Sequence, residues 1–490
     1  MRRFLPHLVR RAVLLLFVSL VFTSASASAA EPRPREGIGV PTVWPGSAVV
    51  GSTLFFTWFT ADTQLELWKT DGTAAGTRLV KDINTTTNTA YLESSSPRQF
   101  HAVNGRLLFF ADDGVHGREL WVSDGSEAGT QMVMDINPGP GSSELEPLSE
   151  IQSRVVGNKL FFMVDVGDFE LELWVSDGTS ANTRRVRAID SDSYSPIEMV
   201  SFKGKLYFTA AVASGPVELW VSDGTAAGTM PVKRQSRNGI DGEFCHLVAT
   251  DTLLWMLGGG CNASGELWTS DGTTAGTRLL RDDMGYVFAL TPVGSRVVFI
   301  VDDLDGGSKE LWSSDGTLAG TQKLRVVEAS TPRYDSSDAF LRPSLQTSGT
   351  VAYFRAPSNG GSLPWQMWRT DGTDAGTRAL GSTSSFHTGL STIVPVGQGV
   401  FYLGGSETTS SQIMYHDGTS QAARVLPIEN EYPEMMIRTP LGNQAVVLTF
   451  DSNTATVWVS DGSAAGTREI HSTSLRCDYG CRVYVPLIRR

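Results

Sequence analysis

The segment that decides the fold reads Glu66-Leu-Trp-Lys-Thr-Asp-Gly-Thr-Ala-Ala-Gly-Thr77, and it recurs with small changes nine times along the chain. Its Asp-Gly pair predicts a tight turn, because the aspartate accepts hydrogen bonds from the amides just ahead of it and glycine adopts positive φ. Successive copies lie 44 to 56 residues apart, so one structural unit is repeated over most of the 490 residues. The aspartates that mark the copies are Asp71, Asp124, Asp177, Asp223, Asp271, Asp315, Asp371, Asp417 and Asp461.

Each copy carries four short segments that are typical of strands. In the second copy, a hairpin signal at Asn104-Gly105 separates the first two segments, and Asp124-Gly125 separates the last two. The second segment of a copy is continuously apolar, as in Val297–Ile300, which indicates a strand covered on both faces. No segment of useful length has helical spacing. We therefore predict an all-β chain in which each repeat forms four strands.

Four-stranded units of this length, buried on both faces, predict the blades of a β-propeller. A β-solenoid is the alternative all-β repeat, but its coils are much shorter. We expect residues 31–476 to form a single ring of eight or nine blades built from the nine repeats. Two smaller rings are the alternative, although no obvious linker divides the chain. The C-terminal tail, residues 477–490, is expected to add a strand to an early blade and help close the ring.

The first thirty residues have the layout of a secretory signal peptide. Four arginines precede an apolar stretch at 12–22, and Ala27-Ser28-Ala29 offers a cleavage site. The apolar stretch is too short to span a bilayer as a helix, which takes about 20 residues. We therefore expect residues 1–30 to be removed on export to the periplasm, the cell surface or the medium, leaving no membrane span.

Charge and cysteine content limit the partners and the compartment. The net charge of −12 comes from 40 Lys and Arg against 52 Asp and Glu, which argues against a nucleic-acid partner. An even number of cysteines in an exported chain favours disulfides, with buried free thiols as the alternative. Local pairing is the simplest of the three connectivities. The four cysteines are Cys245, Cys261, Cys477 and Cys481, and the local pairs are Cys245–Cys261 and Cys477–Cys481.

A tryptophan stands three residues before the aspartate in eight of the nine copies, and Met414 replaces it in the eighth copy. We expect these tryptophans to pack between blades rather than to serve as a platform for a ligand. The repeated aspartates are also expected to be structural, because one carboxylate per loop supplies too few oxygens for calcium. The tryptophans are Trp68, Trp121, Trp174, Trp220, Trp268, Trp312, Trp368 and Trp458.

The register of the last hairpin follows if the Ser or Thr before each aspartate pairs with the threonine six residues after it. The glutamate of the frame then faces the tenth residue after the aspartate, which is Lys or Arg in five copies, as in Glu218 and Lys233. We therefore predict a cross-strand ion pair in these copies. In the third copy Asn182 replaces the second glycine, and asparagine tolerates positive φ, so the same turn is expected there.

The Glu-Leu-Trp-x-x-Asp-Gly-Thr frame with its trailing Ala-Gly-Thr resembles the bacterial ELWxxDGT repeat family, whose members are sometimes labelled hyalin-repeat proteins. The segments Ala111–Trp121 and Asp135–Gly139 look like the fuller repeat of that family. The resemblance covers nearly all of residues 50–470. It implies an exported β protein built from repeats. It implies no established activity, and it offers no catalytic residues to carry over to this chain.

The sequence shows no catalytic fingerprint, because the metalloprotease, nucleophile-elbow, phosphate-loop and dinucleotide motifs are all missing from it. No catalytic residue, cofactor or metal site is therefore predicted. The six histidines that follow the signal segment are expected to be ordinary surface or core residues. They are His101, His116, His246, His387, His416 and His471.

Three functions compete at this stage. The favoured one is a monomeric, non-enzymatic binding or scaffold protein whose loops hold a protein or glycan ligand, since repeat arrays present many loops on one face. The second is a propeller enzyme acting on glycans, a glycosidase or polysaccharide lyase. It would bring carboxylates, His, Tyr or Arg together at the channel mouth from irregular loops such as 234–243 and 328–343. The third is a structural surface or matrix component.

Overall fold

The computed structural model describes the chain between residues 46 and 474, with internal gaps. The chain divides into two units, Met1–Ile38 and Gly39–Arg490, and every described residue belongs to the second unit. The predicted signal peptide (1–30) and the predicted ring-closing tail (477–490) lie outside the described residues. The described ranges are 46–60, 62–86, 94–143, 153–165, 170–190, 198–211, 216–234, 236–237, 240–259, 265–302, 308–328, 345–357, 365–380, 393–404, 412–419, 423–428, 441–450 and 454–474.

Nine antiparallel sheets follow one another along the chain. Blades one to three are β1 (Ser47–Val50), β2 (Thr53–Thr60), β3 (Gln64–Thr70) and β4 (Arg78–Lys81); β5 (Arg98–Val103), β6 (Arg106–Asp112), β7 (Arg118–Ser123) and β8 (Gln131–Met134); and β9 (Ser153–Val156), β10 (Lys159–Asp165), β11 (Glu170–Ser176) and β12 (Arg184–Asp190), with the short helix η1 (Ser180–Asn182). Blades four to six are β13 (Met199–Phe202), β14 (Lys205–Ala211), β15 (Val217–Ser222) and β16 (Met230–Lys233); β19 (Cys245–Ala249), β20 (Leu254–Gly258), β21 (Glu266–Ser270) and β22 (Arg278–Arg281); and β23 (Tyr286–Val293), β24 (Arg296–Asp302), β25 (Lys309–Ser314) and β26 (Gln322–Glu328). Blades seven to nine are β27 (Gln346–Ser348), β28 (Val351–Pro357), β29 (Trp365–Thr370) and β30 (Arg378–Ala379); β31 (Ile393–Val396), β32 (Gly399–Gly404), β33 (Gln412–His416) and β34 (Arg424–Val425); and β35 (Ala445–Phe450), β36 (Thr454–Ser460) and β37 (Arg468–Ser474). A small hairpin of β17 (Ser236–Arg237) and β18 (Ile240–Asp241) lies between blades four and five in the sequence.

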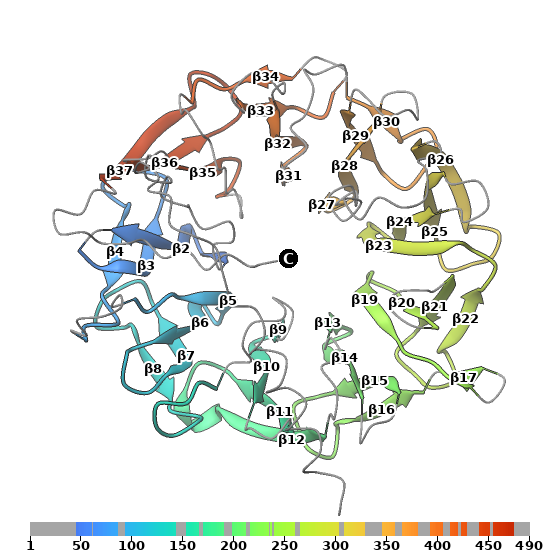
Figure 1. Cartoon of the computed structure of the whole chain (residues 1–490), viewed down its shortest axis with the longest axis horizontal. Helices are drawn as coiled ribbons and strands as arrows, with labels where there is room; N and C mark the ends of the chain where they lie inside the picture. Colours follow the sequence, from blue (N-terminus) through green and yellow to red (C-terminus); the bar gives the residue numbers. More distant parts are fainter. Residues whose placement is uncertain are drawn as a thin grey trace, which may run out of the picture. The chain divides into compact units, whose positions relative to one another are not determined.

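The sheets stand side by side in a ring, and each is built from one contiguous stretch of chain (Figure 1). The first strand of each blade lies innermost and contacts the first strand of the next blade, from β1 and β5 through to β27 and β31. The ninth blade has three described strands, beside which Leu441 and Gln444 form an isolated bridge. The predicted β-propeller of a single ring is confirmed, with nine blades, and the alternative of two smaller rings is wrong.

Each Asp-Gly turn is held by its own aspartate. In the first blade the Asp71 carboxylate accepts hydrogen bonds from the amide and the hydroxyl of Thr73, at 2.9 and 2.6 Å. Gly72 has a φ of +88°, as predicted for the turn glycine. The second glycine serves a different purpose, because a Cβ on Gly76 would lie 2.0 Å from the Asp71 Oδ1. In the third blade Asn182 keeps the turn without positive φ, by lying in η1 and donating from Nδ2 to the turn aspartate at 2.8 Å.

The last hairpin of a blade follows the predicted register only near its turn. Thr70 and Thr77 share a hydrogen bond of 2.8 Å, as the pairing rule predicts. A β-bulge then shifts the register by one residue, so that Leu67 rather than Glu66 faces Lys81. The same shift occurs in blades two to six and in blade nine. The predicted partners are therefore wrong, because a shift of one residue turns a side chain to the opposite face of the sheet. Two of these glutamates form an ion pair with another cation of the facing strand, Glu172 with Arg185 at 2.8 Å and Glu310 with Lys323 at 2.9 Å.

The displaced cations join neighbouring blades instead. Lys81 donates to the carbonyl oxygen of Thr130 in the next blade at 2.9 Å, and its ammonium lies 5.7 Å from the ring centre of Trp121. Arg187 and Arg281 make the same two kinds of contact with the blade that follows each of them. A cation over an indole ring is attracted by the electron-rich face of the ring. The recurring Lys or Arg thus stabilises the interface between blades.

The hydrophobic core lies between the blades. Trp121 of blade two packs with Phe55 and Leu67 of blade one. Trp268 of blade five packs in the same way against side chains of blade four. Met414, which stands at the tryptophan position of the eighth copy, is 4% exposed and joins the core shared by blades seven and eight. Each sheet therefore covers its neighbour, and this mutual burial holds the ring together.

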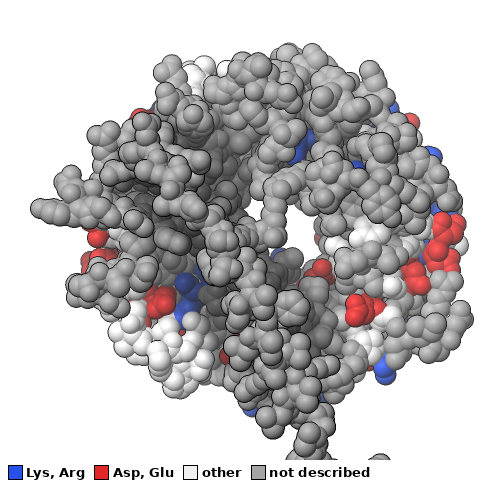
Figure 2. Space-filling model, viewed as in Figure 1, with Lys and Arg blue, Asp and Glu red and all other residues white. Residues whose placement is uncertain are grey.

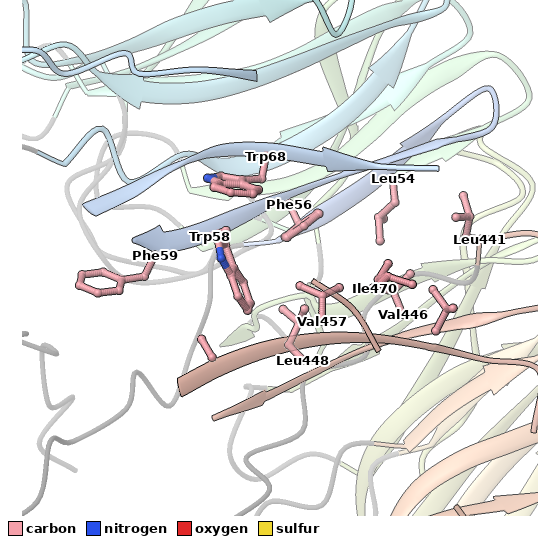
Figure 3. Close-up of a cluster of buried hydrophobic side chains, with 12 residues drawn as sticks. Leu54, Phe56, Trp58, Phe59, Trp68, Leu441, Val446, Leu448, Val457 and Ile470 are labelled. Atoms are coloured by element: carbon pink, nitrogen blue, oxygen red, sulfur yellow. The ribbon is translucent and has the colours of Figure 1, made fainter. Parts of the chain in front are cut away.

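The ring closes where blade nine meets blade one. Figure 3 shows Trp58 of β2 above Val457 of β36, within a cluster of buried side chains from both blades. The indole Nε1 of Trp58 donates to the hydroxyl of Thr473 at 3.3 Å. Arg468 donates to the carbonyl oxygen of Gly72 at 3.1 Å. In the residues that the structure describes, side-chain packing and hydrogen bonds join the first and last blades.

Candidate functional site

The innermost strands leave one edge unpaired toward the centre of the ring. In blade four the amide of Thr209 donates to the carbonyl oxygen of Glu198 at 3.1 Å, so the next carbonyl, that of Met199, points away from β14. A side chain that binds this carbonyl therefore lies on the inner wall. We define the inner-wall arc as six residues on or beside β5, β9, β13 and β19: Gln99, His101, Ser153, Arg154, Glu198 and His246.

The arc begins between blades two and three. The hydroxyl of Ser153 on β9 donates to the Gln99 Oε1 at 2.6 Å and lies 2.8 Å from the His101 Nε2 on β5. Because the hydroxyl hydrogen is used by Gln99, the imidazole Nε2 carries a hydrogen and donates to Ser153. The other imidazole nitrogen, Nδ1, is then an acceptor. Desolvation, with a smaller effect of Arg154, lowers the pKa of His101 to about 4, so its imidazole is neutral at pH 7.

This serine and histidine do not form an activated nucleophile. Ser153 is 4% exposed, and its hydroxyl is bound on two sides. A histidine with so low a pKa is a weak base, whereas a catalytic base works best with a pKa near the working pH. The geometry therefore indicates that Ser153 and Gln99 fix the position and the tautomer of His101.

Arg154 continues the arc from blade three to blade four. Its Nε donates to the carbonyl oxygen of Met199 at 2.9 Å, which holds the guanidinium on the inner wall. The side chain is exposed to solvent, yet desolvation by surrounding protein lowers its pKa. A side chain that projects into the enclosed space of a ring is both exposed to solvent and partly desolvated by the protein around it. Arginine stays protonated at neutral pH, so the inner wall carries a fixed positive charge here.

Glu198 and His246 complete the arc across blades four and five. The Glu198 carboxylate accepts hydrogen bonds from the backbone amides of Leu247 and His246. Burial raises the pKa of Glu198, and these bonds together with the nearby imidazole of His246 oppose the rise. A carboxyl with a raised pKa beside an imidazole is an arrangement suited to exchanging protons with a third group.

A β-bulge between Cys245 and Val248 sets the direction of the His246 side chain. His246 has a φ of +55°, which side chains other than glycine rarely adopt. Gln99 and Ala289 have the same conformation at the corresponding bulges of β5 and β23. Such local strain often occurs at functional sites. Of these three bulge positions, Gln99 and His246 belong to the inner-wall arc.

The arc departs from the repeat. His101 and Arg154 face Leu108 and Phe161, which are the residues of the second strand that pair with the position after the repeat tryptophan. The residues at the same place in other blades are uncharged: Ala48, Val200, Val248, Thr291, Gln346 and Val394. A repeat needs neither side chain for its fold, and among the eight blades compared only blades two and three carry a charged or titratable group at this position.

The structure places the residues singled out from the sequence away from this arc. The repeated aspartates sit in the turns between third and fourth strands, and the tryptophans lie in or beside the cores between blades. Cys245 is buried in β19, while Cys261, Cys477 and Cys481 lie outside the described residues, so the disulfide pairs stay predictions. Of the histidines that the structure describes, His101 and His246 belong to the inner-wall arc. His116 binds Asp113, His416 is buried in blade eight, His471 lies against Trp68 with the two rings tilted by 45°, and His387 is not described.

On the face that Figure 2 shows, the described acidic side chains form several separate groups, some with basic side chains beside them. Within the described ranges, no three His, Cys, Asp or Glu side chains converge as a metal site would require. No helix in the described part of the chain is long and apolar enough to cross a membrane.

Comparison with known proteins finds likeness in structure alone. No family model matches the chain, and no curated protein matches it. A puromycin hydrolase in complex with PGG is 14% identical, with a TM-score of 0.42 over 80% of this chain and 55% of that chain. A puromycin-hydrolyzing peptidase of Mycobacterium tuberculosis is 11% identical, with a TM-score of 0.38 over 65% and 53%. TolB from Acinetobacter baumannii is 11% identical, with a TM-score of 0.28 over 63% and 77%. The chain spans about half the length of the first two proteins.

These comparisons correct the function expected from the sequence. A non-enzymatic binding or scaffold protein finds no support in them, because the puromycin hydrolase and the peptidase are enzymes. At identities of 11 to 14%, the likeness shows the fold alone and assigns no activity to this chain.

Proposed function

We propose that this protein is an enzyme that transfers protons on an organic substrate bound against the inner-wall arc. Glu198 acts as the general base and His246 as the matching general acid. The observation that carries the proposal is the Glu198 carboxylate, whose burial raises its pKa while the His246 imidazole acts on it from the next blade. A base with a raised pKa takes up a proton more readily near neutral pH, which is what proton transfer requires.

The Glu198 carboxylate has a fixed position in the arc. The carboxylate of Glu198 is held by backbone amides of β19, so it keeps its position when a substrate enters. The His246 imidazole acts on the Glu198 carboxylate electrostatically and lowers its pKa. A substrate atom between them would lose its proton to Glu198 and regain one from His246 on another atom. Cleavage by hydrolysis or by elimination both fit this scheme.

The test is a turnover screen with wild-type protein and two variants. Purified chain lacking residues 1–30 is incubated with chromogenic glycosides, acidic oligosaccharides and peptide anilides. Turnover of at least one class is expected, and Glu198→Gln should lower its kcat by about 100-fold or more, the usual contribution of a general base. His116→Asn is the matched control and should leave turnover unchanged, because His116 binds Asp113 away from the inner wall. Failure of the wild type on the whole panel, or full activity of Glu198→Gln, refutes the proposal.

The same proposal includes export of the protein and its membership of the ELWxxDGT repeat family. The signal-like residues 1–30 support an exported enzyme, and the resemblance of the repeat frame to the ELWxxDGT repeat family is in keeping with export. An N-terminal sequence of the protein recovered from the culture medium or periplasm tests this part separately.

A further inference from the structure

The guanidinium of Arg154 is the one fixed cation of the inner-wall arc. Its Nε donates to the Met199 carbonyl oxygen at 2.9 Å, which sets the plane of the group, and the residue is exposed to solvent. In the part of the chain that the structure describes, no carboxylate pairs with Arg154. A charged fork that is held by one bond and lacks an acidic partner is prepared to receive an anion.

The charges around Arg154 limit what that anion is. His101 is neutral at pH 7, because desolvation lowers the pKa of its imidazole to about 4. Glu198, one blade further along, contributes a carboxylate to the same arc. Among the described residues, the wall therefore offers one positive charge at this point, because the neutral His101 adds none. A carboxylate, with one negative charge and two oxygens in a plane, matches the guanidinium fork better than a doubly charged phosphate does.

His101 adds a second element of recognition. Its Nε2 hydrogen is committed to the Ser153 hydroxyl, so its Nδ1 is left as an acceptor. This Nδ1 forms no hydrogen bond with any described residue. An acceptor beside a cation repels a bare carboxylate but accepts a hydrogen bond from a hydroxyl group. The two side chains together therefore select a carboxylate that has a hydroxyl close to it.

We infer that the substrate is a hydroxy acid, whose carboxylate is held by the Arg154 guanidinium and whose hydroxyl donates to the His101 Nδ1. This inference rests on the proposed function, because the bound hydroxy acid is placed beside Glu198 and His246 on the adjoining blades. An acidic sugar and a simple 2-hydroxy acid carry the same chemistry. Arg154 and His101 hold and orient the substrate, and neither takes part in the proton transfer.

Chemical footprinting tests the inference without any turnover. Phenylglyoxal modifies accessible arginines, and mass spectrometry follows the rate at Arg154 in the full mature chain. D-Galacturonate and L-lactate are the hydroxy-acid probes. Three control compounds each lack one feature: propionate lacks the hydroxyl, D-galactose lacks the carboxylate, and inorganic phosphate lacks the single charge. One or both hydroxy acids should slow modification of Arg154 several-fold, and propionate should do so less. Modification of Arg78, exposed on the outermost strand β4, should not change with any probe.

The pattern of protection distinguishes an acidic sugar from a simple 2-hydroxy acid, and it decides whether the inference stands. Protection by galacturonate alone identifies an acidic sugar, and protection by both hydroxy acids identifies the smaller group as sufficient. No protection by either, equal protection by galactose, or stronger protection by phosphate overturns the inference. In a His101→Phe variant the advantage of the hydroxy acids over propionate should disappear, and an unchanged advantage would remove His101 from the site.

The same proteins distinguish this inference from the proposed function. Glu198→Gln should lose turnover while Arg154 is still protected by the hydroxy acids. Protection of Arg154 with full turnover in Glu198→Gln would refute the proposed function and keep the binding site. Loss of turnover in Glu198→Gln without any protection at Arg154 would keep the enzyme and refute the hydroxy-acid substrate.

Discussion

Replacing Glu66 by glutamine should remove a defined pH dependence from the stability of the ring. Glu66 is fully buried and accepts hydrogen bonds from the amides of Ile83 and Ser95, at 3.0 and 2.9 Å. Burial outweighs these bonds and raises the pKa of Glu66 from 4.5 to about 7. The folded chain therefore binds this proton more tightly than the unfolded chain does. Stability falls as the pH rises from 4.5 to about 7 and is level above that range.

The size of the effect follows from the difference between the two pKa values. At about 1.4 kcal/mol for each pKa unit, ionising Glu66 in the folded state costs about 3 kcal/mol. Urea unfolding, followed by tryptophan fluorescence between pH 5 and pH 8, measures the free energy of unfolding. Over this range the wild type should lose about 2 to 3 kcal/mol more than Glu66→Gln, which keeps the shape and does not titrate. The exposed Glu127→Gln should follow the wild type. Parallel pH profiles for the wild type and Glu66→Gln would refute the burial argument.

Gly228→Ala should lower the melting temperature, since its Cβ would lie 2.1 Å from the Asp223 Oδ1 and overpacking costs about 1–3 kcal/mol; an unchanged thermal melt would contradict this. Trp268→Ala should lower the free energy of unfolding by about 3–5 kcal/mol, because its indole packs into the core shared with blade four; a loss below about 1 kcal/mol in urea would speak against that packing. Deleting residues 477–490 should lower the melting temperature if this tail closes the ring, and equal melts would exclude the role. Mass spectrometry of the exported protein should find a mature N-terminus next to Ala30, whereas an intact Met1 would contradict the signal peptide.

The turns and the blades could be predicted because their determinants are local. Asp71, Gly72 and Thr73 lie within three residues of one another, and the turn needs only their own hydrogen bonds and a positive φ. Four such strands per repeat, with the second covered on both faces, predict a blade, and repetition predicts a ring. None of these steps requires knowledge of a distant contact.

The register of the last hairpin could not be predicted in full. Pairing across the turn was right for Thr70 and Thr77, but the bulge two residues further on leaves no mark in the sequence. The residue at the bulge, Val80, is apolar. An apolar residue suits a position facing the neighbouring strand as well as a position in the core between blades, so the sequence does not distinguish the two. The contact that decides between these two arrangements is made by the neighbouring blade, as the bond from Lys81 to Thr130 shows.

The inner-wall arc was also missed, although a signal for it exists. Its contacts join residues about one repeat apart, with separations of 52, 45 and 49 residues for His101–Ser153, Arg154–Met199 and Glu198–Leu247. Aligning the first strands of the nine copies would have shown His101 and Arg154 where other copies have Ala, Val, Thr or Gln. A search for catalytic motifs cannot find such a set, because its residues come from four different blades.

The sequence by itself determined the repeated turn, the four-stranded blade and the single ring, because these depend on interactions within a few residues and on their regular return. The tertiary structure alone decided which side chains meet across neighbouring blades. It turned the frame glutamates and cations to different partners, and it set Arg154, Glu198 and His246 on one wall. The physical reason is that closure of the ring brings together the inner edges of separate sheets, and no local pattern records how those edges face one another.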